Sequence, residues 1–433
     1  MADIAQLQKM RENVFSDGMA SLSVRKDRLL RLRKALLNHE QALNTALHQD
    51  LRKSREEVWA SEIGMVIAEL NEAIGSLKKW MAPKRVGTNF LNWPSKSYLY
   101  NEPLGLVLII APWNYPVQLL FNPLIGALAA GNLAVLKPSE FTPATEEVMR
   151  SIVQEAFTPE EVLYVTGDGA VVVPDLLQSF TFDHVFYTGS TSVGRLVYKM
   201  AADRLVPVTL ELGGKSPTVV ESDANLRVAA KRIAAMKFLN CGQTCVAPDY
   251  ILVHRSVHDR FIEELKAAVT KFYSQQPKQS ESFGRIVNTR QFDRLVSYLG
   301  NDKILFGGGN DRSDLYIEPT LLTNVSLDSA VMNEEIFGPV VSVMSFDDEA
   351  DAIAKANDSE FGLSGSIWTN NSGKAIRVAR AVESGNLSVN SNSSVRYWTP
   401  FGGYKQSGLG RELGPDALDS FTEVKNVFIA TDN

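Results

Sequence analysis

The stretch Leu104-Gly-Leu-Val-Leu-Ile-Ile-Ala-Pro-Trp-Asn-Tyr-Pro-Val-Gln-Leu-Leu-Phe-Asn-Pro-Leu-Ile-Gly-Ala-Leu-Ala-Ala-Gly-Asn-Leu-Ala-Val-Leu136 contains no charged residue. A run of this length is long enough to cross a bilayer. It is, however, interrupted by Pro112, Pro116 and Pro123, and four amide side chains lie within it. These breaks favour a strand over 105–111, a buried helix over 119–130 and a strand over 133–136. All-apolar strands are typical of a parallel sheet that is covered on both faces.

An alternation of strands and helices continues on the C-terminal side of this stretch. Strands are expected at 162–166, 184–188, 217–221, 251–255, 303–306, 340–346, 364–369, 387–390 and 427–430, and helices at 143–157, 171–177, 192–202, 226–239, 257–272, 348–357 and 372–382. The first 80 or so residues have the apolar spacing of helices, and 95–102 has that of an exposed strand. The fold class is therefore α/β, with parallel, doubly wound sheets. A ligand is expected at the carboxyl ends of the strands.

Composition excludes several classes of protein. The chain has 433 residues and a formal net charge of −6, from 44 basic and 50 acidic residues. This charge argues against binding to nucleic acid or to an anionic membrane surface. Two cysteines rule out a disulfide framework, and the N-terminus shows no secretory signal, so a reducing cytoplasm is expected. His254 and His258 have the spacing of a zinc helix but lack its glutamate, so no metal site is predicted.

The segment Asn240-Cys-Gly-Gln-Thr-Cys-Val-Ala-Pro248 places two cysteines between a predicted helix and a predicted strand. A thiol on a loop beside a sheet edge is accessible to a substrate, and nearby backbone N–H groups favour its thiolate. Cys245 is therefore a candidate nucleophile, although an unpaired cysteine is often simply buried and inert. Cys241 is expected in the last turn of the preceding helix, where it is buried.

Glu211 is the candidate base. It lies among apolar residues and is followed by Gly213 and Gly214, which allow another chain segment or a ligand to approach the backbone. An acid removed from water has a raised pKa, which suits a general base. The alternative is that the side chain points to solvent.

Three further turns carry polar residues after predicted strands. The turn Thr188-Gly-Ser-Thr-Ser-Val-Gly194 opens a helix and suits a phosphate, although Ser190 or Thr191 also suits a simple N-cap. Lys137 and Glu140 offer groups for ribose hydroxyls, or form an ordinary solvated loop. Asn114 offers an amide that can stabilise an oxyanion. Glu334 and Glu335 precede an aromatic residue and also fit a helix start.

Seven segments, taken together and in order, resemble motifs of the aldehyde dehydrogenase superfamily. They are Pro-Trp-Asn-Tyr-Pro at 112–116, Lys-Pro-Ser-Glu at 137–140, Thr-Gly-Ser-Thr-x-x-Gly at 188–194, Glu-Leu-Gly-Gly-Lys-Ser-Pro at 211–217, Gly-Gln-Thr-Cys at 242–245, Glu-Glu-Ile-Phe-Gly-Pro at 334–339 and Pro-Phe-Gly-Gly-Tyr-Lys-Gln-Ser-Gly at 400–408.

This resemblance implies a role for each motif residue. Cys245 is implied to attack the aldehyde carbon, the Asn114 amide and the Cys245 N–H to hold the oxyanion, and Glu211 to activate water for thioester hydrolysis. The implied cofactor is NAD, with NADP possible, since Glu140 favours a free ribose hydroxyl while Lys137 offsets its charge. The implied cofactor residues are Pro112, Trp113, Lys137, Ser139, Glu140, Gly189, Ser190, Val193, Leu212, Gly213, Glu335 and Phe337.

The resemblance also implies a division of the chain. A Rossmann-type cofactor domain takes in 1–83 and 105–211, with a return at about 407–421. A second α/β domain, the catalytic one, takes in 212–406. Residues 84–104 and 422–433 form a small β oligomerisation arm. The short N-terminus and the motifs at 112–116 and 245–250 are similar to those of class 3 members, which suggests a homodimer, with a tetramer as the alternative.

The expected substrate is a small-molecule aldehyde. Tyr115, Tyr397 and Trp398 suit an aromatic entrance for aliphatic or aromatic aldehydes. Arg396 instead suits the carboxylate of a semialdehyde such as succinic semialdehyde. The segment 396–414 is more similar to semialdehyde or aminoaldehyde oxidisers than to class 3. Two further alternatives are a coenzyme A-acylating dehydrogenase and a catalytically silent protein on the same fold. The presence of Glu211 favours water over coenzyme A.

Overall fold

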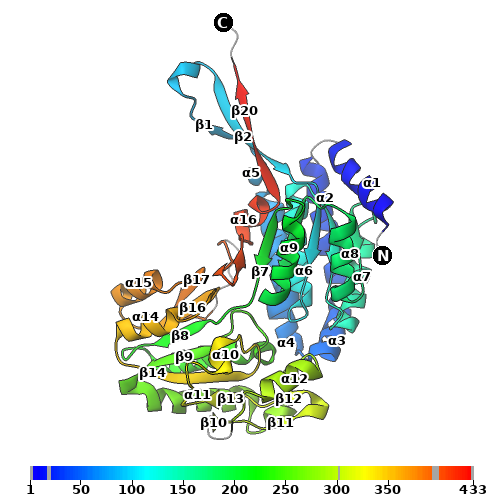
Figure 1. Cartoon of the computed structure of the whole chain (residues 1–433). Coiled ribbons are helices and arrows are strands. Elements are labelled where there is room, and N and C mark those ends of the chain that lie inside the picture. The colour runs from blue at the N-terminus through cyan, green and yellow to red at the C-terminus, as the bar shows by residue number, and fades with distance from the viewer. Residues whose placement is uncertain (1–2, 17–20, 301–302, 393–398, 431–433) are drawn as a thin grey trace.

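The computed structural model describes residues 3–16, 21–300, 303–392 and 399–430. Figure 1 shows two parts built on sheets and a narrow arm that projects from the upper part and carries the C-terminal strand. The predicted fold class is confirmed, because both main sheets are parallel over most of their strands and are flanked by helices.

The first sheet has six strands in the order β19-β7-β6-β3-β4-β5. All neighbours are parallel except β19, which runs antiparallel to β7. The strands are β3 (Leu106–Ile110), β4 (Leu133–Lys137), β5 (Val162–Tyr164), β6 (His184–Thr188), β7 (Val208–Glu211) and β19 (Gly408–Leu409). The helices of this part are α1 (Ile4–Ser16), α2 (Leu22–Asn38), α3 (Glu40–Leu51), α4 (Arg55–Val58), the π-helix η1 (Trp59–Ile63), α5 (Gly64–Trp80), α6 (Pro116–Ala130), α7 (Pro143–Ala156), α8 (Gly169–Ser179), α9 (Thr191–Ala202) and α16 (Gly414–Asp419).

The position of strand β3 explains why its part of the uncharged stretch 104–136 contains only apolar residues. Alternate side chains of a strand point to opposite faces. Val107 and Ile109 join the core beneath α2, α5, α6 and α7, whereas Leu106, Leu108 and Ile110 join a second core with α1, α8 and α9. Both faces of the strand are buried, so neither has room for a polar side chain.

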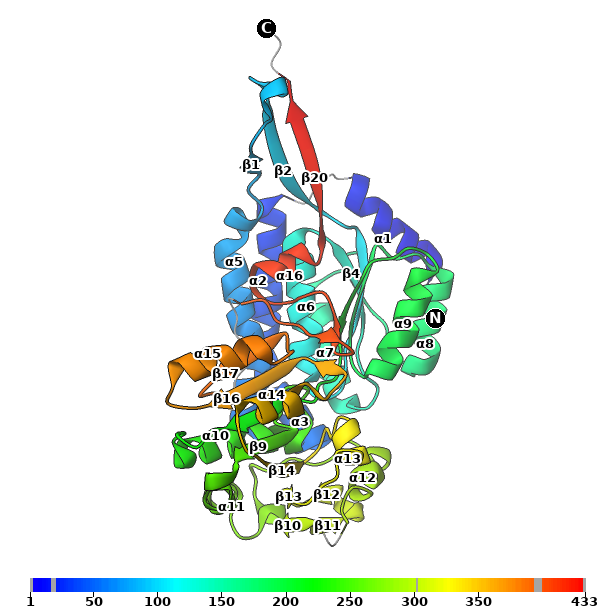
Figure 2. The same cartoon turned by 60° about the vertical axis from the view of Figure 1, so that its left-hand side comes forward.

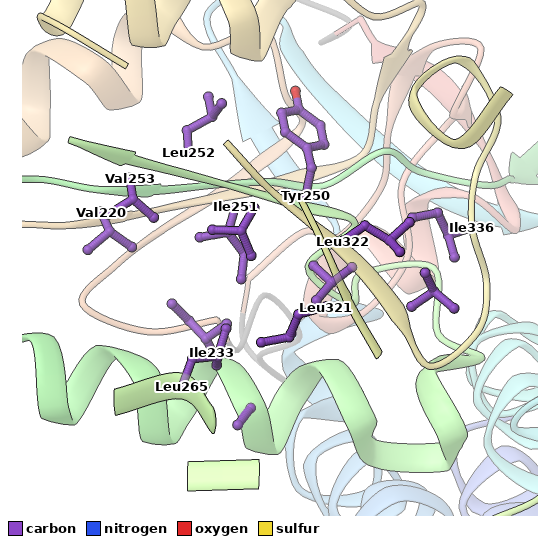
Figure 3. Packing of buried hydrophobic residues seen from close by; sticks show 14 of the residues in the cluster. Val220, Ile233, Tyr250, Ile251, Leu252, Val253, Leu265, Leu321, Leu322 and Ile336 are labelled. Atoms are coloured by element: carbon purple, nitrogen blue, oxygen red, sulfur yellow. The ribbon is translucent and has the colours of Figure 1, made fainter. Parts of the chain in front are cut away.

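The second sheet has seven strands in the order β10-β13-β14-β9-β8-β16-β17. They are β8 (Pro217–Val220), β9 (Tyr250–His254), β10 (Ile304–Phe306), β13 (Thr320–Leu322), β14 (Val340–Phe346), β16 (Ser364–Trp368) and β17 (Asn386–Val389). The surrounding helices are α10 (Leu226–Phe238), η3 (Leu239–Gly242), η4 (Arg255–Val257), α11 (His258–Tyr273), η5 (Pro277–Gln279), α12 (Thr289–Val296), η6 (Arg312–Asp314), α13 (Ala330–Asn333), α14 (Glu349–Asn357) and α15 (Ser372–Ala381). Short strand pairs are β11 (Asn310–Asp311) with β12 (Tyr316–Ile317), and β15 (Phe361–Gly362) with β18 (Tyr404–Lys405). Figure 3 shows Ile233 and Leu265, from α10 and α11, packed beneath strands β8, β9 and β13.

The arm is a three-stranded antiparallel sheet in the order β1-β2-β20 (Figures 1 and 2). It consists of β1 (Lys84–Val86), η2 (Phe90–Asn92), β2 (Lys96–Pro103) and β20 (Thr422–Ile429). The C-terminal strand therefore begins five positions earlier than the sequence analysis expects. Val424 and Phe428, on β20, are about half exposed, at 54% and 48%.

The six-stranded sheet gathers the predicted site residues at one edge. Its register pairs Ile110 with Lys137 and with Tyr187, and pairs Thr188 with Glu211. The carboxyl ends of β3, β4, β6 and β7 therefore lie side by side, and the turns that follow them open on the same side of the molecule.

The chain passes to the second sheet between β7 and β8, close to the predicted domain boundary at 211. The domain boundaries themselves stay predictions. Within the described residues, no helix has the length and apolar character required to cross a membrane.

Candidate active site

A cavity of about 840 Å³ lies between the two sheets at this edge. Its lining combines the turns after β3, β6 and β7 with the loop that carries Cys245 and with segments from the second sheet. The predicted residues that line it are Pro112, Trp113, Asn114, Gly189, Ser190, Glu211, Leu212, Gly213, Cys245, Glu335 and Phe337. All three predicted catalytic residues therefore share one cavity.

The loop before Cys245 has an unusual backbone. After α10, Asn240 and Cys241 both adopt left-handed φ angles, 49° and 54°, as does Gly242 at 74°. A Cβ on Gly242 would lie 2.2 Å from the carbonyl oxygen of Gly338, so only glycine fits there. Cys241 is buried, as expected, but it lies in η3 beyond the end of α10 and not in the last turn of that helix, whereas Cys245 is partly exposed. Burial and the nearby Glu335, Glu211 and Glu412 raise the pKa of the Cys245 thiol. The thiol is therefore neutral at rest and needs a proton acceptor to react.

Glu211 is buried at the end of β7, and neither of its carboxyl oxygens has a hydrogen-bond partner among the described residues. Loss of water raises the pKa of Glu211 well above its ordinary value, the Glu412 carboxyl raises it further, and Arg411 opposes both effects. The pKa of Glu412 itself is raised to about 7 by burial. Glu412 lines the same cavity. The alternative in which Glu211 points to solvent is wrong, since the side chain is only 4% exposed.

Asn114 is buried at the start of the turn that leads into α6. Its Nδ2 donates to the carbonyl oxygen of Gln243 at 3.0 Å, and its backbone carbonyl accepts from the side chains of Asn240 and Lys53. Asn114 is thus tied to the loop that carries Cys245. One N–H of its amide is bonded in this way, and the other is available to an oxyanion.

The predicted cofactor residues fall into two groups. Glu335 Oε1 accepts the N–H of Gly214 at 2.9 Å, and Trp113 and Phe337 form an edge-to-face pair with centroids 5.4 Å apart. Burial and the nearby Asp249 raise the pKa of Glu335 to about 8, against the hydrogen bond from Gly214. Ser190 caps α9, its Oγ accepting the N–H of Val193.

The second group lies outside the cavity lining. It consists of Lys137, Ser139, Glu140 and Val193. Lys137 Nζ donates to the Pro138 carbonyl at 2.6 Å and to Glu140 Oε2 at 3.2 Å, while Glu140 Oε1 accepts the N–H of Gly169 at 2.9 Å. Lys137 ends β4, Ser139 and Glu140 follow it, and Val193 lies in the first turn of α9, after β6. The role of these four residues stays a prediction.

Of the predicted substrate residues, only Tyr115 is among the described residues, and it does not line the cavity. Tyr115 is 7% exposed, and its hydroxyl lies 2.6 Å from Thr244 Oγ1. Arg396, Tyr397 and Trp398 lie outside the described residues.

Sequence reasoning missed several residues of the cavity wall. Arg294 and Gln291 come from α12, which was not predicted, although Phe292, Leu295 and Val296 have helical spacing. Arg294 donates to the carbonyls of Glu335 and Ile336 at 3.2 and 2.7 Å and so holds the segment that carries Glu335. Glu412 lies in a Gly-Arg-Glu-Leu-Gly run that looks solvated, and no sequence signal marks it as buried. Among the described residues, no group of three or more His, Cys, Asp or Glu side chains is arranged to hold a metal ion.

The aldehyde dehydrogenase family model matches residues 9–427 of this chain. The chain belongs to the aldehyde dehydrogenase family. The enzyme is 43% identical to the 4,4'-diaponeurosporen-aldehyde dehydrogenase of Staphylococcus aureus (strain NCTC 8325 / PS 47), over 94% of this chain and 89% of the relative. It is 38% identical to the 4,4'-diapolycopene-4,4'-dial dehydrogenase of Cytobacillus firmus, over 96% and 92%. It is also 38% identical to aldehyde dehydrogenase family 3 member A2 of Rattus norvegicus, over 96% and 86%.

Solved structures agree with these relatives. A substrate-bound AldH of Staphylococcus aureus superposes with a TM-score of 0.95 at 40% identity, covering 100% of this chain and 95% of the other. An indole-3-acetaldehyde dehydrogenase in complex with NAD+ has a TM-score of 0.90 at 30% identity, covering 98% and 88%. The predicted family, including its likeness to class 3, is confirmed. The enzyme is an oxidoreductase that acts on aldehydes, and oxidation to the carboxylic acid with NAD is the family's reaction.

The residues present fit NAD. Gly213 allows the chain to pass close to Glu335, since a Cβ there would lie 2.4 Å from Glu335 Oε2. The carboxylate of Glu335 suits ribose hydroxyls, and the first turn of α9 offers N–H groups for phosphates. The edge-to-face rings of Trp113 and Phe337 provide an apolar wall for a nicotinamide.

Proposed function

We propose that the enzyme oxidises a long, apolar aldehyde to its carboxylate, with Cys245, Glu211 and Asn114 as its catalytic residues. The observation that carries the catalytic assignment is that one cavity brings these three side chains together with Glu335 and Ser190. A soft nucleophile, a desolvated carboxyl and an amide donor are the groups that acyl transfer through a thioester requires.

In this proposal each residue acts at a stated atom. Cys245 Sγ attacks the carbonyl carbon, and its proton passes to the ionised carboxylate of the Glu211–Glu412 pair, which releases the proton to solvent before thioester hydrolysis. The Asn114 amide and the Cys245 N–H hold the oxygen of the thiohemiacetal. When bound, NAD supplies the hydride acceptor. Glu211 then takes a proton from water, which attacks the thioester and releases the acid while Sγ leaves.

The substrate class is inferred from the relatives and from the cavity wall. The relatives from Staphylococcus aureus and Cytobacillus firmus are named as dehydrogenases of 4,4'-diaponeurosporen-aldehyde and of 4,4'-diapolycopene-4,4'-dial. Apolar side chains of the cavity wall here include Trp113, Leu119, Met332, Phe361 and Phe401. Its one described cationic residue, Arg294, already donates to backbone carbonyls and to Tyr298, so it is not free to bind a substrate carboxylate.

We further propose that NAD is preferred to NADP and that the enzyme works as a homodimer in the reducing cytoplasm. The negative charge of Glu140 repels a 2′-phosphate, and Lys137 is already paired with it. Cys245 must stay reduced to act as a nucleophile. The predicted division into a cofactor domain, a catalytic domain and an arm agrees with the separate sheets and supports a dimer formed through the arm.

The test measures NAD reduction by absorbance with a long-chain apolar aldehyde in micelles, benzaldehyde, an aminoaldehyde and succinic semialdehyde, beside Cys245→Ala. We expect the highest kcat/KM for the long apolar aldehyde, a lower value with NADP, and no turnover in the variant. A preference for succinic semialdehyde would overturn the substrate proposal. A thioester product formed only in the presence of coenzyme A would instead support an acylating enzyme.

A further inference from the structure

A buried cluster of charged side chains lies directly behind the proposed oxyanion site, outside the catalytic set. Its members come from the segment between α3 and α5, which is far in sequence from every family motif quoted above. Lys53 and Glu62 are both 0% exposed, and Lys53 Nζ donates to Glu62 Oε1 at 2.6 Å. Neither residue lines the cavity.

The ammonium of Lys53 reaches Asn114. Its Nζ donates to the backbone carbonyl of Asn114 at 2.8 Å and lies 4.0 Å from the centre of the Tyr115 ring. The same carbonyl accepts from Asn240 Nδ2 at 2.7 Å. Two donors thus occupy both lone pairs of one carbonyl oxygen and fix the peptide plane that follows the Asn114 side chain.

Glu62 fixes the other side of this turn. Its second carboxyl oxygen accepts the N–H groups of Val117 and Gln118, in the first turn of α6, at 3.1 and 3.0 Å. A carboxylate at a helix N-terminus satisfies donors that have no partner within the helix. Lys53 and Glu62 therefore hold the turn 114–118 from behind as one unit.

The cluster is also bonded to the loop that carries the nucleophile. Asn114 Nδ2 donates to the carbonyl of Gln243, and the hydroxyl of Tyr115 lies 2.6 Å from Thr244 Oγ1, next to Cys245. Glu57 Oε1 accepts the N–H of Asn240 at 2.8 Å, where the left-handed backbone begins. The distance between the oxyanion donor and the thiol is thus set by contacts that pass through Asn114, Tyr115 and Asn240.

Burial of this ion pair is costly, because each charge loses its hydration. A well-packed apolar pair of the same volume would fill the space at less cost. What such a pair cannot do is donate to the Asn114 carbonyl and accept from α6 at the same time. This difference gives the charged pair a use beyond filling the core.

We propose that Lys53, together with Glu62, is a positioning residue that holds the Asn114 amide where it can donate to the oxyanion formed when the Cys245 thiol attacks. The proposal rests on the proposed roles of Asn114 and Cys245. Loss of the Lys53 ammonium frees the turn 114–118, and a displacement of about 1 Å at a catalytic group is enough to cost on the order of 10²-fold in rate.

The test is a double-mutant cycle that combines Lys53→Met with Asn114→Ala, measured by hydrolysis of a p-nitrophenyl ester without NAD. This reaction needs the thiol and the oxyanion donor but no cofactor. We expect Lys53→Met to lower kcat about 10²-fold and to leave KM and NAD affinity unchanged. In the Asn114→Ala background the same substitution should have almost no effect, because Lys53 acts through that amide.

The matched control is Lys374→Met, which breaks another ion pair to a buried carboxylate, that of Glu221, at 2.8 Å. Lys374 and Glu221 are absent from the cavity wall, so we expect this variant to lose stability but not activity.

Asn240→Gly removes the second donor to the Asn114 carbonyl while tolerating the left-handed backbone. It serves in place of Lys53→Met if that variant does not fold. Independent, multiplicative losses in the cycle would overturn the proposal. Full ester hydrolysis by Cys245→Ala would instead overturn the underlying catalytic assignment.

Discussion

At the scale of single residues, the site consists of side chains whose ordinary protonation is disturbed. Cys245, Glu211, Glu335 and Glu412 all have raised pKa values, and in each case loss of water is the largest cause. Several acids share one water-poor cavity, so each proton that leaves makes the next one harder to remove. This arrangement suits a base that works near neutral pH.

The pair of Glu211 and Glu412 gives a direct test of this interpretation. The Glu412 carboxylate raises the pKa of Glu211. Glu412→Gln removes that negative charge, so the pKa of Glu211 should fall. The acid limb of the pH profile for thioester hydrolysis should then move to lower pH. Stopped-flow measurement of the deacylation rate from pH 5 to 9 checks this, with the distant Glu318→Gln as control. An unmoved or upward-shifted limb would contradict the coupling.

At the scale of elements, parallel strands gather residues that are far apart in sequence. Strands β3, β4 and β6 could be predicted because both of their faces are buried and each contains an apolar run, with polar residues only at the ends of β4 and β6. Once these strands are placed, the turns that carry Asn114, Glu140 and Ser190 must meet at one edge. The short β13 was missed because its three residues show no periodicity of their own, and it exists only through pairing with β10 and β14.

The arm exposes apolar side chains that no other described part of the chain covers. It projects from the body, and Val424 and Phe428 of β20 are both about half exposed on it. We expect Val424→Glu with Phe428→Glu to convert a dimer into a monomer, because charges placed in an apolar interface lose hydration without gaining partners. Light scattering after size exclusion gives the mass directly.

Val171→Glu, a change at an apolar residue on α8 that is 65% exposed, is the control for this experiment. It should leave the mass unchanged. A double arm variant that retained the mass of the parent protein would show that the arm does not carry the interface.

At the scale of the whole molecule, the residues that sequence reasoning could not find are the buried charges. Lys53, Glu62 and Glu412 are charged residue types, which are usually exposed, so the sequence predicts them on the surface, whereas all three are buried. Their burial follows from tertiary contacts that no local pattern encodes. Cys245 and Glu211, by contrast, are marked by glycines and by apolar neighbours, so their segments could be recognised before the fold was known. A buried charged residue without such neighbours can be recognised only when the groups that it contacts are known.

These buried acids also make the stability of the whole protein depend on pH. The folded-state pKa is raised to about 7 for Glu57 and to about 8 for Glu69, chiefly by burial. Between its ordinary and its raised pKa, each carboxyl binds a proton in the folded chain but not in the unfolded chain. Stability therefore falls as pH rises through this range. For each carboxyl that stays protonated in the folded chain, the free energy of unfolding falls by up to about 1.4 kcal/mol per pH unit.

The window from pH 6.5 to 8 separates the raised carboxyls, which include Glu335 and Glu412, from His184, because the pKa of buried His184 is lowered to about 4 and its opposing contribution ends near pH 6.5. We expect the melting temperature of the parent protein to fall steadily across this window. Glu69→Gln should flatten the slope, since Glu69 Oε2 has no partner among the described residues and Glu69 does not line the cavity. Calorimetry at four pH values measures both slopes. A melting temperature that rose with pH, or equal slopes in the two proteins, would mean that these carboxyls are ionised in the folded chain.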